Sequence, residues 1–307
     1  MRTFSIIEGI GRVTTQIVTV GDNVVDCYPD LGVMYPGGNT VNVAVHVRRL
    51  KATSGYIGAV GTDAAGELVH GALLTENVDC SRVRKVHGPN ARAYIRLEKG
   101  NRAFIGSDPG VSIFTVDAGD LTWMHGAAAV HTGECSGLDA QLPELHALPG
   151  LLSYDFSIRP MGYVAALAPH VDVAILSYES SHASSPTALA RQVQAMGPQV
   201  VAVTIGANGA IVVQGNEIAE SAAPHVDVVD TLGAGDAFIA RLLVGIVRGE
   251  SLGRMADAST AYASQTCSYY GAFGYETALP NENAQIPEGP SASSEVQVDS
   301  ISTREFG

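Results

Sequence analysis

The sequence predicts an α/β fold built as one large domain, and three observations support this prediction. The chain has 307 residues, 46% of them hydrophobic, which is enough to bury a substantial core. Its 34 glycines and 6% aromatic residues suit short buried strands that alternate with helices. From residue 127 onward, short β-branched runs alternate with helix-like segments, which indicates a parallel sheet with helices on its faces.

The first part of the chain predicts the beginning of this sheet. A β-branched run at 16–22 ends in Gly-Asp, as a buried strand does when it stops at a turn. The segment 39–50 is ambiguous, because its valines alternate as in a strand while its polar positions and basic end suit a helix. We expect a helix there, followed by a strand at 54–61 and a helix over about 64–76.

Two stretches predict a small sheet outside the main core. Residues 91–107 alternate apolar and polar side chains on both sides of Glu-Lys-Gly-Asn, which indicates a hairpin with one solvated face. A second extended piece at 24–36 could pair with this hairpin.

The rest of the chain continues the alternation of strand and helix. We expect strands at 127–133, 151–157, 171–177 and 199–206, helices near 138–147, 160–168 and 186–196, a hairpin at 209–221, and helices at about 235–248 and 252–268. From about residue 277 the sequence is rich in Pro, Ser, Glu and Asn and poor in apolar residues. We therefore expect a domain at 1–276 and a tail at 277–307 that is disordered or an appendage.

Charge and composition exclude several classes of protein. The net charge of −13 argues against a nucleic-acid partner, which needs a clustered positive field, and mildly favours cationic or metal-chelated ligands. The four cysteines are far apart in the sequence, as isolated buried thiols are in a reducing cytoplasm. The first 15 residues lack the pattern of a signal peptide. The most apolar helical segment, 238–249, is too short to cross a bilayer, which needs about 20 apolar residues. We expect a soluble, cytoplasmic protein.

The stretch "DTLGAGDAFIA" at 230–240 is the strongest candidate for a functional motif. If residues 233–235 form the turn into the following helix, its first N–H groups have no partners within the helix and create an anion site. Gly233, Ala234 and Gly235 would let a phosphate approach the backbone closely.

Asp236 stands at the mouth of this anion site and has two interpretations. An acid there repels a bound phosphate, but in phosphoryl transfer a carboxylate must accept the proton of the attacking hydroxyl group. Asp236 would then be the base, and residues 233–235 would stabilise the charge of the transferred group. Alternatively, Asp236 is only an acid favoured at a helix start. The motif is neither a P-loop nor a dinucleotide fingerprint.

This motif resembles the C-terminal signature of the ribokinase-like, PfkB-type carbohydrate kinases, in which the final Asp is the catalytic base. "PGGNTVNVA" at 36–44 resembles the N-terminal glycine signature of the same family. The resemblance covers about residues 17–275. It implies a ribokinase-like three-layer αβα domain with a small β lid, ATP as phosphoryl donor and Mg²⁺ as cofactor. The sequence leaves open whether a monovalent cation is needed.

The resemblance also implies substrate-binding residues. "GDNVVD" at 21–26 matches a strand end whose last Asp holds substrate hydroxyls, which carries over to Asp26. One carboxylate can accept hydrogen bonds from two hydroxyl groups. Gly37, Gly38 and Asn42 fall where the family has its substrate-facing glycines and amide. Alternatively, Asn42 is a polar residue on a helix face.

Two further segments match the nucleotide site of the family. "TIGANGA" at 204–210 resembles the turn near the ATP phosphates and ribose, and 258–274 occupies the place of the adenine-lining helix and its following glycine. The implied nucleotide contacts are Thr204, Gly206, Gly209, Ala261, Ser264 and Gly271. The alternative for the first segment is a glycine hairpin turn without a ligand.

One departure from the family concerns magnesium. The family commonly has Asn-x-x-Glu before the nucleotide site, whereas this chain has Ser177 and Ser180 at those positions and Glu179 one place early. Mg²⁺ is held mainly by nucleotide phosphates and water in such sites, so activity need not be lost. Asp155 could substitute near the phosphates or be a strand-end turn acid. We assign no metal ligand.

Within the family, the chain most resembles the fructoselysine 6-kinases, through residues 21–47, 151–157 and 269–274. This implies phosphorylation of the terminal hydroxyl group of a sugar-amine. The alternatives are a ribokinase, a nucleoside kinase or another ketose kinase, and, in a different class, a non-catalytic sugar or nucleotide sensor. The resemblance also implies that segments 24–36 and 91–106 form a lid over the sugar and pair in a homodimer.

Overall fold

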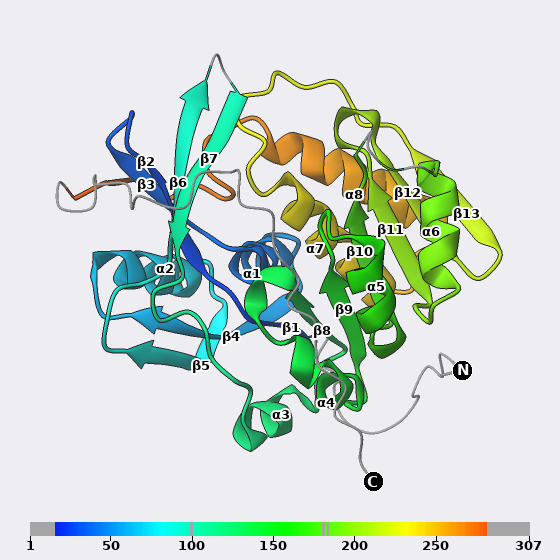
Figure 1. Cartoon of the computed structure of the whole chain (residues 1–307), viewed down its shortest axis with the longest axis horizontal. Coiled ribbons are helices and arrows are strands. Elements are labelled where there is room, and N and C mark those ends of the chain that lie inside the picture. Colours follow the sequence, from blue (N-terminus) through cyan, green and yellow to red (C-terminus); the bar gives the residue numbers. More distant parts are fainter. Residues whose placement is uncertain (1–15, 99–100, 180–181, 183, 281–307) are drawn as a thin grey trace, which may run out of the picture.

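The computed structural model describes residues 16–98, 101–179, 182 and 184–280, and a nine-stranded sheet forms the centre of this part of the chain (Figure 1). The strand order is β13-β12-β11-β10-β9-β8-β1-β4-β5. Pairing is parallel from β11 to β5 and antiparallel at the β12–β13 edge. The strands are β1 (Gln16–Val20), β4 (Thr53–Gly61), β5 (Asp79–Val86), β8 (Ala129–Gly133), β9 (Leu151–Asp155), β10 (Val173–Ser177), β11 (Val200–Thr204), β12 (Ala210–Gln214) and β13 (Glu217–Ser221).

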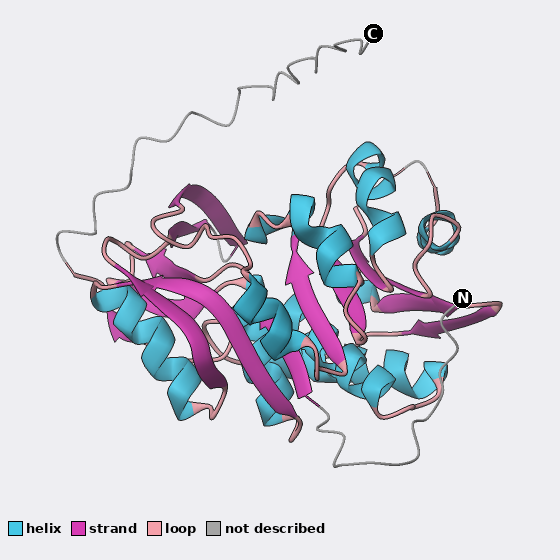
Figure 2. Ribbon diagram, turned by 90° about the horizontal axis from the view of Figure 1, so that it is seen from below, coloured by secondary structure: helices cyan, strands magenta, loops and turns pink. Residues whose placement is uncertain are grey.

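Helices cover both faces of this sheet, so the domain has three layers (Figure 2). Alternate residues of β1 point to opposite faces: Ile17 belongs to the hydrophobic cluster that includes residues of α1, α7 and α8, whereas Val18 belongs to the cluster that includes residues of α4, α5 and α6. The helices are α1 (Asn39–Arg49), α2 (Ala64–Thr75), α3 (Ala118–Met124), α4 (Leu142–His146), α5 (Met161–Leu167), α6 (Pro186–Gln194), α7 (Ala234–Val247) and α8 (Leu252–Thr266). The predicted α/β class is confirmed, as is the helix expected at 39–50.

A second sheet lies beside the main one and has the strand order β14-β3-β2-β6-β7 (Figure 1). Its strands are β2 (Val24–Tyr28), β3 (Val33–Gly37), β6 (Arg92–Glu98), β7 (Asn101–Asp108) and β14 (Thr277–Ala278). The extended piece and the hairpin do pair, through parallel contacts between β2 and β6. The expected tail boundary before residue 277 differs from the structure, because β14 pairs with β3 and Leu279 is buried. Residues 281–307 lie outside the described part of the chain.

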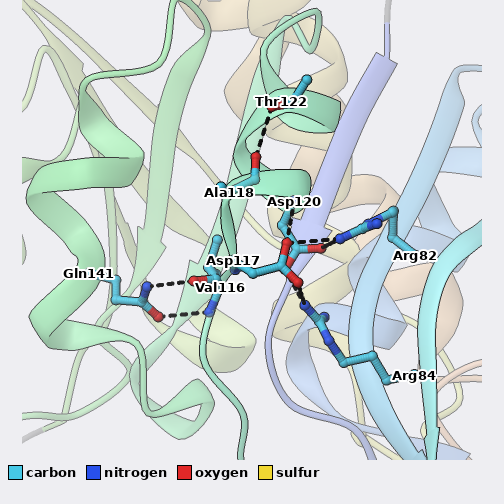
Figure 3. Close-up of polar contacts among 8 residues, drawn as sticks. All are labelled: Arg82, Arg84, Val116, Asp117, Ala118, Asp120, Thr122 and Gln141. Carbon is cyan, nitrogen blue, oxygen red and sulfur yellow. Dashed lines mark hydrogen bonds and ion pairs between the residues drawn. The ribbon is translucent and has the colours of Figure 1, made fainter.

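Two elements were not expected from the sequence, β5 and α3, and ion pairs join them (Figure 3). Arg82 and Arg84 of β5 both contact Asp120, whose side chain is fully buried. Both arginines also contact Asp117, the N-cap of α3. These ion pairs stabilise β5 and α3. Neither element has a regular pattern of apolar residues, so the hydrophobic pattern of the sequence does not predict them.

The structure bears on the expectations about membrane-spanning helices and about the cysteines. In the described ranges, no helix combines the length and apolarity needed to cross a membrane. All four cysteines are free, and Cys27 and Cys267 are buried as expected. Cys135 is exposed, so the expectation of buried thiols was wrong at that position, which lies in the turn after β8. The first 15 residues, where no signal peptide was expected, lie outside the described residues.

Candidate active site

Three carboxylates meet at the edge of the main sheet where its parallel strands end. Asp22 follows β1, Asp155 is the last residue of β9, and Asp236 lies in the first turn of α7. The N-terminus of α1 reaches the same place, because Asn39 donates hydrogen bonds to all three. Ligand sites of open α/β sheets are found at this edge, outside the carboxyl ends of the strands.

The turn into α7 is shorter than the sequence predicts. The helix begins at Ala234, within the turn expected at 233–235, and Gly233 is its N-cap with φ 75° and no side-chain cap. A Cβ on Gly233 would lie 2.5 Å from the Cβ of Ala272, so this glycine is required by backbone and packing alike. Gly235 is exposed and a Cβ there would meet nothing within 4 Å. The open space over Gly235 leaves the helix N-terminus accessible to an anion.

Both oxygens of Asp236 accept hydrogen bonds from amides of α1. Asn39 Nδ2 donates to Oδ1 at 2.8 Å, and Asn42 Nδ2 donates to Oδ2 at 2.7 Å. Asn42 Oδ1 is buried without a hydrogen-bond partner among the described residues. Asp236 therefore does more than begin a helix, because two side chains from another helix hold its carboxylate in place.

The other two carboxylates are tied to the same asparagine. Asn39 Nδ2 donates to Asp155 Oδ2 at 3.0 Å, and the Asn39 backbone N–H donates to Asp22 Oδ2 at 2.9 Å. Asp22 thus supplies the cap of α1 that Gly38 lacks. Asp155 also accepts from the Ser157 backbone N–H, so it is both a strand-end turn acid and a neighbour of Asp236.

Burial raises the pKa values of these carboxyl groups. The pKa of Asp155 rises to about 7 because the group is desolvated and lies near Asp236, Glu134 and Asp22. The pKa of Asp236 rises to about 6 through desolvation, while the amides of Asn42 and Asn39 act to lower it. Desolvation is the largest cause of both shifts, and the two neighbouring acids titrate together rather than independently. Asp236 is thus suited to accept a proton near neutral pH.

The predicted substrate-binding residues lie where β2, β3 and α1 meet. Asp26 is a buried residue of β2, paired with Tyr35 of β3. A Cβ on Gly37 would lie 2.3 Å from Asp26 Oδ2, and one on Gly38 would lie 2.7 Å from the Cα of Asn23. Both glycines therefore allow close packing of the segment that joins the small sheet to α1.

The predicted nucleotide contacts are spread over the β11–β12 turn, α8 and the segment after it. Thr204 ends β11 at the same sheet edge as Asp155, and a Cβ on Gly206 would have open space. Packing alone requires a glycine at position 209, because a Cβ there would lie 1.9 Å from the carbonyl oxygen of Ser221. Ser264 is buried and donates to Thr260 within its own helix.

The last two predicted contacts differ in exposure and partners. Ala261 of α8 is half-buried. Gly271 packs against the ring of Tyr35 and donates its N–H to Asp230 Oδ2 at 3.0 Å. Ser180, one position of the altered magnesium motif, lies outside the described residues.

Sequence reasoning missed Asp22 and Asn39 as members of the site. Asp22 was read only as the end of a turn, and Asn39 as an ordinary residue of the glycine signature. Both were visible as polar residues directly after a buried strand and at a helix start, which is the one signal that could have pointed to them.

A three-layer α/β fold with a carboxylate held at the open N-terminus of a helix defines the site of a phosphotransferase that acts on a hydroxyl group. The chain belongs to the pfkB family of carbohydrate kinases, whose model matches residues 9–143 and 161–277. The family predicted from the two signatures is thereby confirmed, and so is the expectation of an enzyme.

Similar proteins agree with this assignment. The chain is 36% identical to the fructosamine kinase FrlD of Bacillus subtilis (strain 168) over 266 residues, covering 85% of this chain and 93% of that protein. It is 34% identical to the fructoselysine 6-kinase of Escherichia coli (strain K12), covering 84% and 99%. Arabidopsis thaliana ribokinase, solved with ribose and ATP, has a TM-score of 0.74 at 21% identity, covering 85% and 95%. The last of these similarities confirms the ribokinase-like fold.

Proposed function

We propose that this kinase transfers the γ-phosphoryl group of ATP to a primary hydroxyl group of a fructosamine, with fructoselysine the first candidate. The observation that carries the proposal is the Asp236 carboxylate, fixed by two amides at the uncapped N-terminus of α7. A held carboxylate beside an anion site provides both the base and the charge stabilisation that phosphoryl transfer requires.

In this mechanism each group has a separate task. Asp236 accepts the proton of the sugar hydroxyl as the oxygen attacks the phosphorus atom. The first N–H groups of α7, beside Gly235, stabilise the negative charge of the transferred group. Asp26 and Asn42 are proposed to bind other hydroxyl groups of the sugar, and Thr204, Gly206 and Ala261 to contact the nucleotide.

Magnesium is proposed to enter with the nucleotide. The described residues hold no group of three His, Cys, Asp or Glu side chains arranged for a metal ion. Asp22 and Asp155 already accept hydrogen bonds from Asn39. Mg²⁺ commonly keeps several waters and binds through substrate phosphates, so a protein cage is not required. When bound, the ion would neutralise charge on the β- and γ-phosphates. A requirement for a monovalent cation is left to measurement.

The substrate class rests on the relatives. The two similar proteins named above carry the names fructosamine kinase and fructoselysine 6-kinase. The net charge of −13 suits a cationic arm on the sugar. The competing substrates are ribose, other ketoses and nucleosides. A sensor without activity is the alternative of another class, and it would bind ligand without forming ADP.

The small sheet is proposed to close over the sugar as a lid. Its Tyr28 hydroxyl group donates to Asp230 Oδ2 at 3.3 Å, which connects the lid to the segment that leads into α7. Closure would exclude water from the phosphoryl group. The lid sheets of two copies would pair in a homodimer, which the mass in solution would reveal. The use of ATP is the argument for a cytoplasmic location.

One experiment tests the function and the base together. ADP formation is measured with fructoselysine, other fructosamines, ribose, fructose and a nucleoside, for the wild type and Asp236→Asn. The variant should bind ATP but lose about 10²- to 10⁴-fold in kcat, the usual contribution of a general base. Asp257→Asn, an exposed acid on α8, is the matched control. Equal kcat for wild type and Asp236→Asn would refute the base, and no turnover of any fructosamine would refute the substrate class.

A further inference from the structure

We infer that Asn39 is a positioning residue for the catalytic carboxylate and that His131 fixes the orientation of its amide. The inference rests on the proposed role of Asp236. It adds a series of hydrogen-bonded side chains that runs from Ser153 of β9 through His131 of β8 to Asn39 of α1. The series ends at the carboxylates of Asp155 and Asp236.

The Asn39 side chain makes three contacts that require one orientation of its amide. Nδ2 donates to Asp236 Oδ1 and to Asp155 Oδ2, and Oδ1 lies 3.0 Å from His131 Nε2. An amide nitrogen carries two protons and an ionised carboxylate only accepts, so both protons are used by the two acids. With the amide turned over, its oxygen would face two carboxylates and its nitrogen would face the imidazole.

The hydrogen bonds of His131 complete this orientation, which the two carboxylates require. Because Asn39 Oδ1 is only an acceptor, Nε2 must carry the imidazole proton. Nδ1 is then an acceptor, and it lies 3.0 Å from the hydroxyl group of Ser153 on β9, which can donate. His131 is fully buried, and burial lowers its pKa to about 3, so the ring is neutral as this arrangement requires. Every donor in the chain from Ser153 through His131 to Asn39 therefore points toward the carboxylates.

The surrounding backbone leaves room for this asparagine and holds it at its other end. A Cβ on Gly133, the last residue of β8, would lie 2.9 Å from Asn39 Oδ1. The backbone N–H of Asn39 donates to Asp22. Asn39 is thus fixed by contacts from β1, β8, β9 and α7, and small changes of its side chain are transmitted directly to Asp236.

The charges around Asp236 make the Asn39 amide important for its ionisation. The amides of Asn39 and Asn42 are the two side-chain donors that lower the pKa of Asp236. The other titratable or charged groups that face this cluster from the packed elements are Asp22 after β1, His131 on β8, Glu134 and Cys135 in the following turn, Asp155 on β9, and Arg159, which pairs with Glu134. With Asn39 removed, carboxylates face one another across the site without the intervening donor.

The pH dependence of kcat/KM separates positioning from a merely structural role. The wild type should lose activity below about pH 6, as Asp236 takes up a proton. A hydrogen bond to a charged group is worth enough to move a pKa by about 1 to 2 units, so Asn39→Ala should move this acid limb upward by that amount. His131→Leu leaves Asn39 Oδ1 without its donor, so the amide is held less firmly against Asp236, and the limb should move in the same direction.

Two further variants make the experiment decisive. In His131→Gln the side-chain nitrogen can take the place of Nε2 and donate to Asn39, so the acid limb should return toward the wild-type position. Asn39→Leu keeps the approximate shape of the side chain while removing the donor without adding a charge, and it answers the question should the alanine variant fail to fold. The control is His46→Leu, because His46 is also buried on α1 but contacts Tyr262 and Ala272 instead.

The outcomes separate this inference from the proposed function. An acid limb that moves upward in Asn39→Ala, Asn39→Leu and His131→Leu, but not in His46→Leu, supports positioning. Activity that falls equally at every pH, with the limb in place, overturns it even where Asp236→Asn is inactive. Full activity of Asp236→Asn would overturn the proposed base itself.

Discussion

Gly235 allows the phosphate site and the stability of α7 to be tested separately. It is the second residue of α7, it is exposed, and a Cβ at this position would meet nothing within 4 Å. In Gly235→Ala the added methyl group therefore fits the free protein. It would stand directly in the space through which a phosphate must approach the first N–H groups of the helix.

Gly235→Ala is expected to leave the free energy of unfolding unchanged or raise it, and to lower kcat. Alanine in a helix is more favourable than glycine by up to about 1 kcal/mol, so the free energy of unfolding should stay the same or rise. Loss of one well-placed donor to the reacting charge costs about 10²- to 10³-fold in kcat. A substitution that is harmless to the fold is thus expected to be severe for catalysis.

Urea unfolding and steady-state kinetics on the same preparations measure the two effects. Gly253→Ala is the matched control, since Gly253 is the second residue of α8, is exposed and also has open space around its Cβ. It should change stability as Gly235→Ala does and leave kcat alone. Gly233→Ala should instead lower the free energy of unfolding. A left-handed backbone at alanine costs about 1–2 kcal/mol, and the contact with Ala272 adds to this cost.

One result would refute the reasoning. If Gly235→Ala keeps the kcat and KM for ATP of the wild type, no phosphate approaches the N-terminus of α7, and the charge-stabilising role of residues 233–235 is wrong. A loss of activity that comes with a matching loss of stability would equally count against it, since the structure leaves room for the methyl group.

Two further predictions concern stability. Because the folded-state pKa of Asp155 is raised to about 7, its contribution to stability is fully present below its ordinary pKa and is lost as the pH rises through about 7. Asp155→Asn should remove this loss, so urea unfolding should show the variant gaining about 3 kcal/mol on the wild type between about pH 5 and about pH 8, and a constant difference would contradict this. Asp120→Ala leaves Arg82 and Arg84 without their buried partner and should cost about 3 kcal/mol, whereas Glu67→Gln, which breaks an exposed pair, should change the free energy of unfolding far less. Equal costs in thermal or urea unfolding would refute the importance of the buried carboxylate.

Local sequence pattern was sufficient for most of the fold. The β-branched run at 16–22, the alternation after residue 127 and the glycines before α7 each carry their signal within a few neighbouring residues, because strand and helix place apolar side chains at periods of 2 and 3.6. The same reasoning failed for β5 and α3, where ion pairs between segments stabilise the elements. The helix α7 starts within the turn expected at 233–235, since Gly233 alone has the left-handed backbone of the turn.

The α/β class, the two glycine signatures and the acid at position 236 can all be recognised in the amino-acid sequence. The surroundings of that acid depend on the folded arrangement of distant segments. Asn39 and Asp236 are 197 positions apart in the chain, and His131 and Asp155 come from two other strands. The order of strands in the sheet brings the ends of β1, β8 and β9 together, and that order depends on packing between distant segments. The ionisation of Asp236 follows from the desolvation and donors that this packing creates, which no short stretch of sequence contains.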